Sequence, residues 1–206
     1  MIITKYDSNY LKGIAILLML FHHLFAFPDR IPATTDVIYI FTSINFESKI
    51  ALFGKICVPL FFFISGYGFS SVNNSSPKYY INKIIQFYKS YWLVFIFFIP
   101  VFFIVNDTKF DLKELVLNII SLRSSYNSEW WFIKPYIFLV LLTPLIRNIR
   151  LKTFTLASIS ILLFLLSFLI RKFNIDIDLI SLNQLFFWQP AFISGYLLAT
   201  YRDSKV

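Results

Sequence analysis

The sequence predicts an all-α fold, a polytopic membrane helix bundle, and its composition is the main reason. Hydrophobic residues make up 58% of the 206 residues, charged residues only 15%, and the mean hydropathy is +0.70. Soluble domains contain about 45–50% apolar and about 25% charged residues. The chain also has 26 phenylalanines and only 5 glycines. This favours lipid-facing helices over a β-barrel, whose strands alternate polar and apolar residues.

Six apolar segments are long enough to cross a bilayer, for which a helix needs roughly 17–25 residues. We therefore expect about six transmembrane helices in one domain that spans residues 1–206. Prolines within these helices are tolerated when neighbouring groups satisfy the backbone. The segments lie near residues 10–27, 54–72, 90–106, 130–146, 153–170 and 184–201.

The first segment follows lysines and could be mistaken for a signal peptide. It lacks a small-residue cleavage site and further apolar segments follow, so we expect a retained helix. It contains Lys12 and both histidines of the sequence, His22 and His23. Such groups are costly in hydrocarbon, which makes an intramembrane function the first hypothesis. The alternative is that both histidines make structural hydrogen bonds.

The second segment contains Ser65-Gly66-Tyr67-Gly68. We interpret this stretch as a close helix-packing surface, because a phosphate-binding loop would follow a strand and open a helix. The single cysteine, Cys57, excludes an intrachain disulfide and a cysteine-built metal site. We expect it to be a small buried apolar residue.

The later segments differ in how well they match an uninterrupted apolar helix. The third, 90–106, follows a lysine-containing stretch. The fourth is the weakest, because Lys134-Pro135 confines its strongly apolar part to residues 136–146. Glu129-Trp130-Trp131 marks its outer end, where tryptophans ordinarily form an interfacial belt, although a role in lining an acceptor path is an alternative. The fifth segment has no charge from residue 154 to 170.

The loop before the fourth segment predicts a short helix on the outer membrane face. Asp111 and Glu114 resemble the start of a capping box. Apolar residues recur from Leu112 to Ile120 at the spacing of one helix face. Such an amphipathic helix is typical of a membrane surface.

Basic residues predict that both termini are cytoplasmic. With the N-terminus inside, the inner pieces hold Asp7 and Asp203 as their acids, and the outer loops hold the other acidic residues. This is the positive-inside pattern. The net charge of +8 therefore reflects topology, and we expect no nucleic-acid partner, which would need a basic face on a soluble domain. The inner basic residues are Lys5, Lys12, Lys78, Lys83, Lys89, Arg147, Arg150, Lys152, Arg202 and Lys205.

Lys12 and His23 share one face of the first helix. The eleven-residue separation is three turns plus about 20°, or about 16 Å along the axis. His22 falls roughly 80° away from Lys12, which leaves it free to hydrogen-bond an adjacent helix. Neighbouring histidines lack the i,i+3 or i,i+4 spacing of metal ligands, so we expect no metal site.

Four stretches, in this order, resemble the membrane acyltransferase-3 family. Leu11-Lys12-Gly13-Ile14-Ala15 with His23 is similar to an opening helix that carries Arg-Gly-x-Ala and a later histidine. The other three are similar to the family's Phe-Phe-x-Ile-Ser-Gly-Phe, Arg-x-x-Arg-x-Tyr-Pro and Trp-Phe-Leu…Pro-Leu motifs. They are Phe61-Phe62-Phe63-Ile64-Ser65-Gly66-Tyr67, the run from Lys83 to Trp92, and Trp131-Phe132-Ile133 through Pro144-Leu145.

The resemblance implies a membrane O-acyltransferase in the plasma or inner membrane. It implies transfer of an acyl group, commonly acetyl, from acyl-coenzyme A (acetyl-CoA) to a hydroxyl of an envelope polysaccharide, glycan or glycolipid. His23 matches the family's essential histidine, and Lys12 matches its arginine but lacks the planar fork for phosphate. Lys83 and Gln86 stand where the family has two arginines, so Lys83 and the nearby Lys89 are the implied coenzyme-A contacts.

Alternatives stay open at this point. The family usually has about ten spanning helices, so the chain resembles its N-terminal part and is expected to be a short or truncated member. An inactive remnant, or a non-enzymatic permease-like bundle with structural histidines, is the alternative function. The acceptor, the acyl chain and the oligomeric state are not determined by the sequence.

Overall fold

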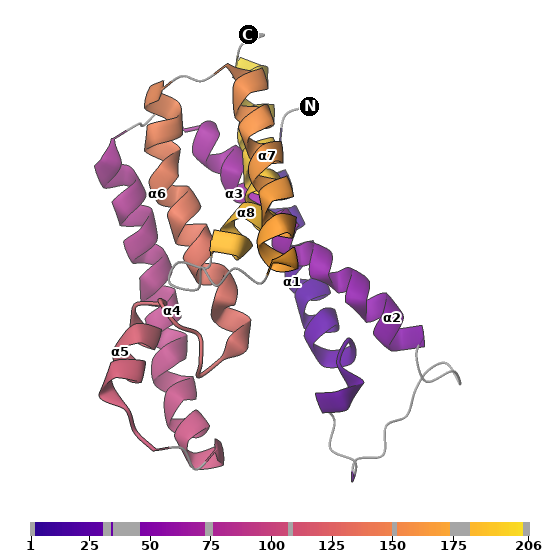
Figure 1. Cartoon of the computed structure of the whole chain (residues 1–206), viewed down its shortest axis with the longest axis vertical. Helices are drawn as coiled ribbons and strands as arrows, with labels where there is room; N and C mark the ends of the chain where they lie inside the picture. Colours follow the sequence, from indigo (N-terminus) through magenta and orange to yellow (C-terminus); the bar gives the residue numbers. More distant parts are fainter. Residues whose placement is uncertain are drawn as a thin grey trace.

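The computed structural model confirms the all-α class. Every regular element among the described residues is a helix (Figure 1). Of these, the helices long and apolar enough to cross a membrane are Phe46–Ser70, Pro77–Val105, Ser128–Ile149 and Thr153–Lys172. The described residues are 3–30, 34, 46–72, 76–106, 109–149, 152–173 and 182–203.

Two further helices are long enough to span but are less apolar. α1 (Lys5–Phe25) has 21 residues and α8 (Leu182–Asp203) has 22, which matches the length of a spanning helix. Neither belongs to the four apolar spans, because each carries several polar side chains. The predicted number of six spans therefore stays a prediction.

Two segments are longer than their apolar cores predicted. α4 (Pro77–Asn106) has 30 residues and begins well before residue 90. At 1.5 Å per residue it is about 45 Å long, more than the roughly 30 Å of a hydrocarbon core, so its polar first turns can lie outside that core. α2 (Phe46–Phe53), η2 (Gly54–Ile56) and α3 (Cys57–Ser70) follow one another without a break, which moves the start of the second span from 54 to 46.

The fourth segment begins with a 3-10 turn. η3 (Ser128–Phe132) leads directly into α6 (Ile133–Ile149). Pro135 lies in the first turn of α6, where a helix does not need the N–H that proline lacks. The lysine and proline that weakened this segment in the sequence therefore mark the start of the helix.

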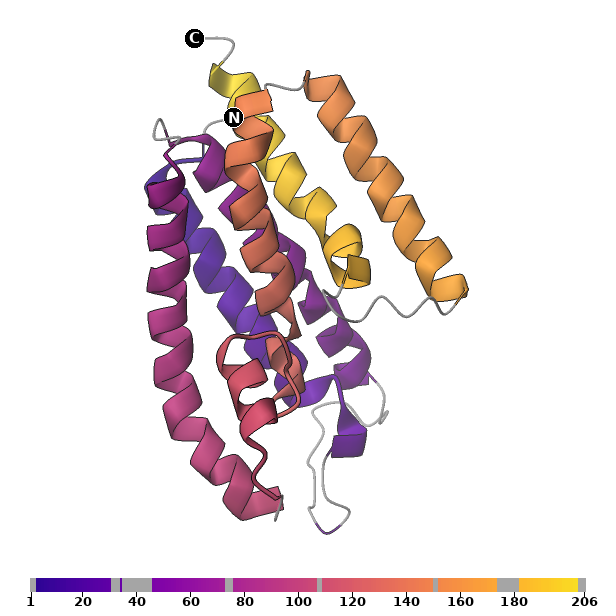
Figure 2. The ribbon, with the colours of Figure 1, turned by 60° about the vertical axis from the view of Figure 1, so that its left-hand side comes forward.

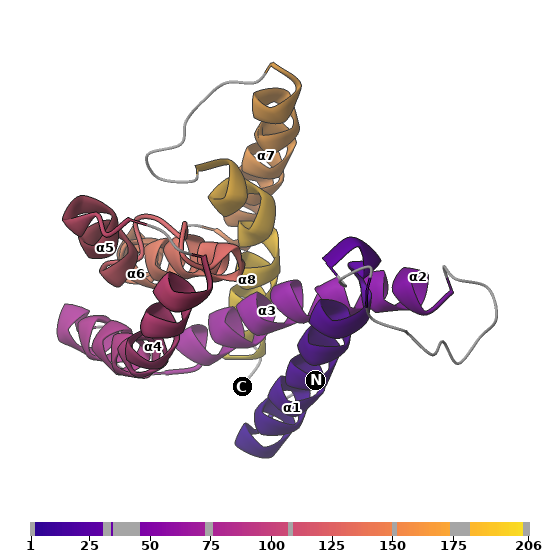
Figure 3. The same ribbon diagram turned by 90° about the horizontal axis from the view of Figure 1, so that it is seen from below.

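α3 and α8 cross at the centre of the helix array. Seen from below, α3 runs between α4 on one side and α1 with α2 on the other (Figure 3). α6 contacts α3, α4 and α8. α7 (Thr153–Lys172) packs along α8 and is the outermost helix on that side (Figure 2).

Glycines allow the backbones of α3 and α8 to touch. A Cβ on Gly66 would collide with the backbone carbonyl of Phe192, and a Cβ on Gly195 would collide with that of Phe63. The same pentapeptide, Phe-Ile-Ser-Gly-Tyr, occurs at 63–67 and at 192–196. The two copies therefore pack against each other in a nearly symmetric way. This confirms the predicted close packing at Gly66, whereas a Cβ on Gly68, the other glycine of the predicted packing surface, would meet nothing within 4 Å.

α7 is joined to α8 by a buried polar pair. Gln189 is 4% exposed; its Nε2 donates to the backbone oxygen of Ser160 at 2.7 Å. The Ser160 hydroxyl donates to Gln189 Oε1, also at 2.7 Å. Each side chain thus satisfies groups that would otherwise be unpaired between two apolar helices.

Replacing Gln189 by Leu should lower the thermal unfolding midpoint in nanodiscs, because the Ser160 hydroxyl loses its partner. Interhelical hydrogen bonds in membranes contribute roughly 0.5–2 kcal/mol. The Ser160→Ala/Gln189→Leu double variant should lose less than the sum of the single variants. A midpoint equal to that of the wild type in Gln189→Leu would contradict this role.

The predicted outer helix is present and is bound to α4. α5 (Leu112–Ile119) begins at the N-cap Asp111, whose Oδ1 accepts a hydrogen bond from the Lys113 N–H at 2.8 Å. The side chain of Glu114 does not complete a capping box; it pairs with Arg123 at 2.7 Å.

Three aromatic side chains of α4 hold the end of α5. Tyr91, Trp92 and Tyr88 donate to the carbonyls of Asn118, Ile119 and Ile120 at 2.6, 3.0 and 2.8 Å. These bonds satisfy carbonyls that the end of a helix leaves free. We call α5 with the loop to residue 127 the outer cap.

The outer cap has an apolar face turned away from α4. Leu112, Val116 and Ile120 are exposed, whereas Leu115 and Ile119 pack toward α4. Tyr126 lies in the loop after α5, where burial and the negative charges of Glu114 and Asp111 raise the pKa of its hydroxyl. The exposed apolar face agrees with a helix on a membrane surface, and that placement stays a prediction.

The described ends of the chain lie at the same end of the array (Figures 1 and 2). The Ile3 N–H donates to the Tyr67 hydroxyl at 3.0 Å, and the Ser70 and Thr200 hydroxyls are 3.0 Å apart. These contacts join the start of α1 to the ends of α3 and α8. The shared end agrees with the prediction that both termini lie on one side, while its cytoplasmic assignment stays a prediction. Arg150 and Lys205, which support that assignment, lie outside the described residues.

Candidate functional site

The last turn of α1 buries His22 against α2 and η2. The His22 side chain is 7% exposed, and its Nδ1 lies 2.9 Å from the carbonyl oxygen of Ala51. A Cβ on Gly54 would lie 2.5 Å from the Leu18 carbonyl oxygen and 3.0 Å from the His22 Cβ. The small residue thus lets η2 approach α1 at this point. His22 therefore makes a hydrogen bond to a neighbouring helix, the structural role expected as the alternative to an intramembrane function.

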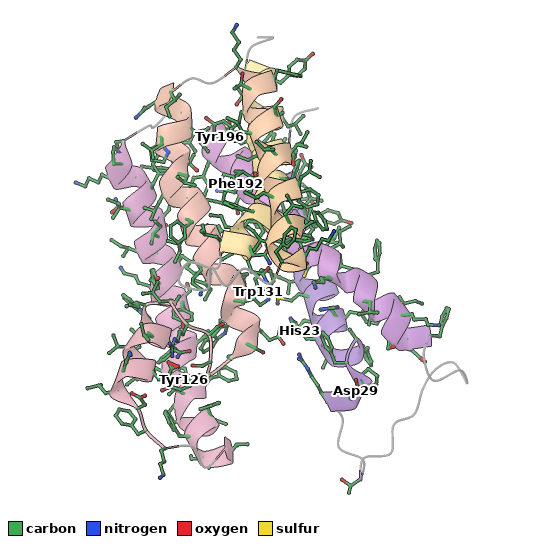
Figure 4. All side chains as sticks on the ribbon, in the orientation of Figure 1. His23, Asp29, Tyr126, Trp131, Phe192 and Tyr196 are labelled. Atoms are coloured by element: carbon green, nitrogen blue, oxygen red, sulfur yellow. The ribbon has the colours of Figure 1, made fainter. Side chains whose placement is uncertain are left out.

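His23 faces a different element. Its side chain is 36% exposed, and its Nδ1 lies 3.7 Å from Glu129 Oε2 in η3 (Figure 4). His22 and His23 therefore differ in both partner and accessibility, although they are adjacent in sequence. The structure leaves His23 open to a reacting group while it holds His22 in the packing.

Glu129 is shared between His23 and a cation. Its Oε1 accepts a hydrogen bond from Arg30 Nη1 at 2.9 Å. Arg30 belongs to η1 (Pro28–Arg30), the short turn after α1, and its guanidinium lies 4.1 Å from the centre of the Phe27 ring. In the sequence, Glu129 adjoins tryptophans typical of a membrane interface, and its contact with His23 and Arg30 was not predicted. The sequence did contain a signal for this contact, because a carboxylate at a membrane interface needs a charged or polar partner.

Lys12 and His23 stay on one exposed face of α1. The helix is continuous from Lys5 to Phe25, so the predicted separation of about 16 Å along the axis holds. Ala15 and His22 are buried on the packed side of α1, whereas Lys12 and His23 are exposed.

Lys83 and Lys89 lie on α4 but not together. Lys83 Nζ is 3.4 Å from Gln86 Oε1 and 5.6 Å from the centre of the Tyr79 ring. Lys89, six residues later, is exposed and lies about 120° away around the helix. The structure thus groups Lys83 with Gln86 and separates it from Lys89.

A comparison with protein families assigns the chain. The family model Acyl_transf_3, an acyltransferase domain, matches residues 5–205. The chain belongs to the acyltransferase-3 family. The match confirms the resemblance that the motifs from Lys12 to Leu145 predicted. No curated protein and no solved structure matches the chain.

As a member of the acyltransferase-3 family with several apolar helices, the protein is a multi-pass membrane acyltransferase. Its candidate site combines an accessible imidazole, a carboxylate and two cations, Arg30 and Lys12. An imidazole can accept a proton from a hydroxyl, and a cation can bind an anionic group of a substrate.

Aromatic side chains adjoin this candidate site. Trp131, two residues after Glu129, packs against Trp188 of α8, with 5.7 Å between ring centres. Trp130 packs against Tyr91 and Phe95 of α4 at 5.1 and 5.7 Å. Both tryptophans are only partly exposed. They therefore join helices within the protein and are more than an interfacial belt.

Proposed function

We propose that this acyltransferase moves an acetyl group from acetyl-coenzyme A to a hydroxyl of an envelope polysaccharide or related glycan, with His23 as general base. The supporting observation is that His23 is accessible on the face that also displays Lys12, while its neighbour His22 is buried in packing. A base is needed because a sugar hydroxyl is a weak nucleophile until its proton is removed.

The proposed step uses the two ring nitrogens differently. His23 Nδ1 faces Glu129, which leaves Nε2 for the acceptor hydroxyl. Nε2 takes the hydroxyl proton as the oxygen attacks the thioester carbonyl. The carbon–sulfur bond then breaks, and the imidazolium returns the proton to the departing coenzyme-A thiolate. The products are the acetyl ester and free coenzyme A.

Lys12 is proposed to bind coenzyme-A phosphates. It lies nearer the start of α1, the end that the basic residues assign to the cytoplasm. Coenzyme A carries its thioester at the end of an extended arm, so a phosphate-binding cation should stand well apart from the base. The separation of about 16 Å along α1 suits this arrangement. Lys83 and Lys89 are proposed to contact coenzyme A at two separate points, because they occupy different faces of α4.

The Lys12 role can be tested with the protein in nanodiscs. Lys12→Met should raise the KM for acetyl-coenzyme A at least about tenfold, with a smaller change in kcat, because a charge-assisted phosphate contact is worth about 1.5–3 kcal/mol. Lys12→Arg should keep or lower the KM, since arginine supplies a planar fork. Lys152→Met, at the start of α7, serves as the matched control. An unchanged KM in Lys12→Met would refute this assignment.

A further inference from the structure

We infer that Glu129 is a positioning residue that orients the ring of His23 and fixes its tautomer, and that Arg30 holds the Glu129 carboxylate in place. The inference rests on the proposed role of His23 as general base. Its starting point is the position of the Glu129 carboxylate, with one oxygen 3.7 Å from His23 Nδ1 and the other 2.9 Å from Arg30 Nη1.

The backbone that carries the Glu129 carboxylate is held by a helix cap. Asn127 caps η3, and its Oδ1 accepts a hydrogen bond from the Glu129 N–H at 3.0 Å. The backbone of Glu129 is thereby held at the first turn of η3. The side chain then reaches back toward the end of α1, and 34% of it is exposed.

Arg30 is fixed through the end of α1. Its guanidinium stacks on the Phe27 ring, and Phe27 packs edge-on against the His22 ring with 5.1 Å between centres. His22 in turn is bonded to Ala51 of α2. The buried histidine therefore supports Arg30, Arg30 binds Glu129, and Glu129 faces the exposed histidine.

This arrangement has a direct consequence for proton transfer. A carboxylate beside Nδ1 favours the tautomer with its proton on Nδ1, which leaves the Nε2 lone pair free for the acceptor hydroxyl. When Nε2 takes that proton, the carboxylate stabilises the imidazolium, as the carboxylate of a catalytic triad does. Arg30 holds the other carboxylate oxygen of Glu129 and so keeps this side chain in place beside His23.

Other charged residues belong to the elements next to α1, including Asp29 in η1. The His22 ring is the other titratable group in contact with His23, with 5.5 Å between ring centres. α3 carries no charged residue. α2 and η2 contain Glu47, Lys49 and Lys55, and these elements meet α1 where His22 and Leu18 pack. Glu129 and Arg30 are therefore the pair to vary.

The test follows the tautomer of His23 directly. With only two histidines in the sequence, isotope labelling of histidine gives two sets of ring-nitrogen NMR signals, and the His22→Asn variant assigns them. In the full-length protein in nanodiscs, the wild-type His23 signals should show the proton on Nδ1. Glu129→Gln should shift them toward the tautomer with the proton on Nε2, and Arg30→Gln should give a smaller change in the same direction, because Arg30 acts through Glu129.

The same variants should change acyl transfer in a matching way. Glu129→Gln should reduce kcat for acetyl transfer at least about tenfold with little change in KM, and Glu129→Asp should retain part of the activity. Arg30→Gln should give a smaller loss of kcat. A merely structural role would not link the loss of kcat to the tautomer of His23.

A matched control comes from the outer cap. Glu114 pairs with Arg123 at 2.7 Å, so Glu114→Gln breaks the same kind of ion pair outside the site. It should leave the His23 tautomer and kcat unchanged. An unchanged His23 tautomer in Glu129→Gln, or a larger change in Arg30→Gln than in Glu129→Gln, would overturn the inference. A change of tautomer in Glu129→Gln without any acetyl transfer by the wild type would support the contact and overturn the proposed function instead.

Discussion

Membranes that contain the His23→Ala variant should show at least about a 100-fold loss of acetyl transfer from acetyl-coenzyme A, because general-base catalysis typically contributes about 10²–10⁴-fold. The exposed position of His23 predicts that this variant still folds, since 36% of the side chain is accessible. Added imidazole should restore part of the activity by entering the vacated position. The measurement is transfer of labelled acetyl groups, with the thermal unfolding midpoint recorded in parallel.

His22→Ala is the matched control at the neighbouring position. It removes the hydrogen bond to the Ala51 carbonyl and should lower the unfolding midpoint, while activity falls less than in His23→Ala. Imidazole should not rescue it, because the position is buried. An equal loss of activity in both variants, without a difference in stability, would contradict the assignment of the two histidines to different roles.

Gly66→Ala should be among the most destabilising single substitutions in the chain. The added Cβ would collide with the backbone carbonyl of Phe192, and a backbone atom cannot move aside as a flexible side chain can. Inserting a methyl group into a tight core costs about 1–3 kcal/mol, occasionally more. The expected result is a lower yield of folded protein and a lower unfolding midpoint in nanodiscs.

Gly68→Ala gives the comparison on the same helix. A Cβ on Gly68 meets nothing within 4 Å, and alanine favours a helix over glycine by roughly 0.5–1 kcal/mol. This variant should therefore be as stable as the wild type or slightly more stable. If Gly66→Ala and Gly68→Ala unfold at the same temperature, α3 and α8 do not pack through their glycines.

The fold class could be predicted from the sequence, because hydrocarbon leaves few ways to satisfy a backbone. The charge-free fifth segment, 153–170, became α7 with nearly the predicted ends. The start of α4 could not be found in this way, since its first turns are polar and a helix needs no apolar residues to form. The symmetric crossing of 63–67 with 192–196 was missed, although the repeated pentapeptide was visible in the sequence.

Only part of the candidate site could be predicted from the sequence. Periodicity along one helix placed Lys12 and His23 on one face, because that relation is local. The contacts of His23 with Glu129 and of Glu129 with Arg30 join elements far apart in the chain. No helical spacing relates them, so they required the packed structure. The separation of Lys83 from Lys89 is a local relation, but it could be derived only once α4 was known to run unbroken from Pro77 to Asn106.

The most direct test of the central proposal is the fate of a labelled acetyl group. Vesicles containing the full chain, with acetyl-coenzyme A on the cytoplasmic side and envelope polysaccharide as acceptor, should produce labelled acetyl ester on the polysaccharide. His23→Ala vesicles should produce almost none. A pH-dependent flux of solute through wild-type vesicles, with no label on the polysaccharide or any other hydroxyl acceptor, would contradict acyl transfer and favour a permease-like bundle.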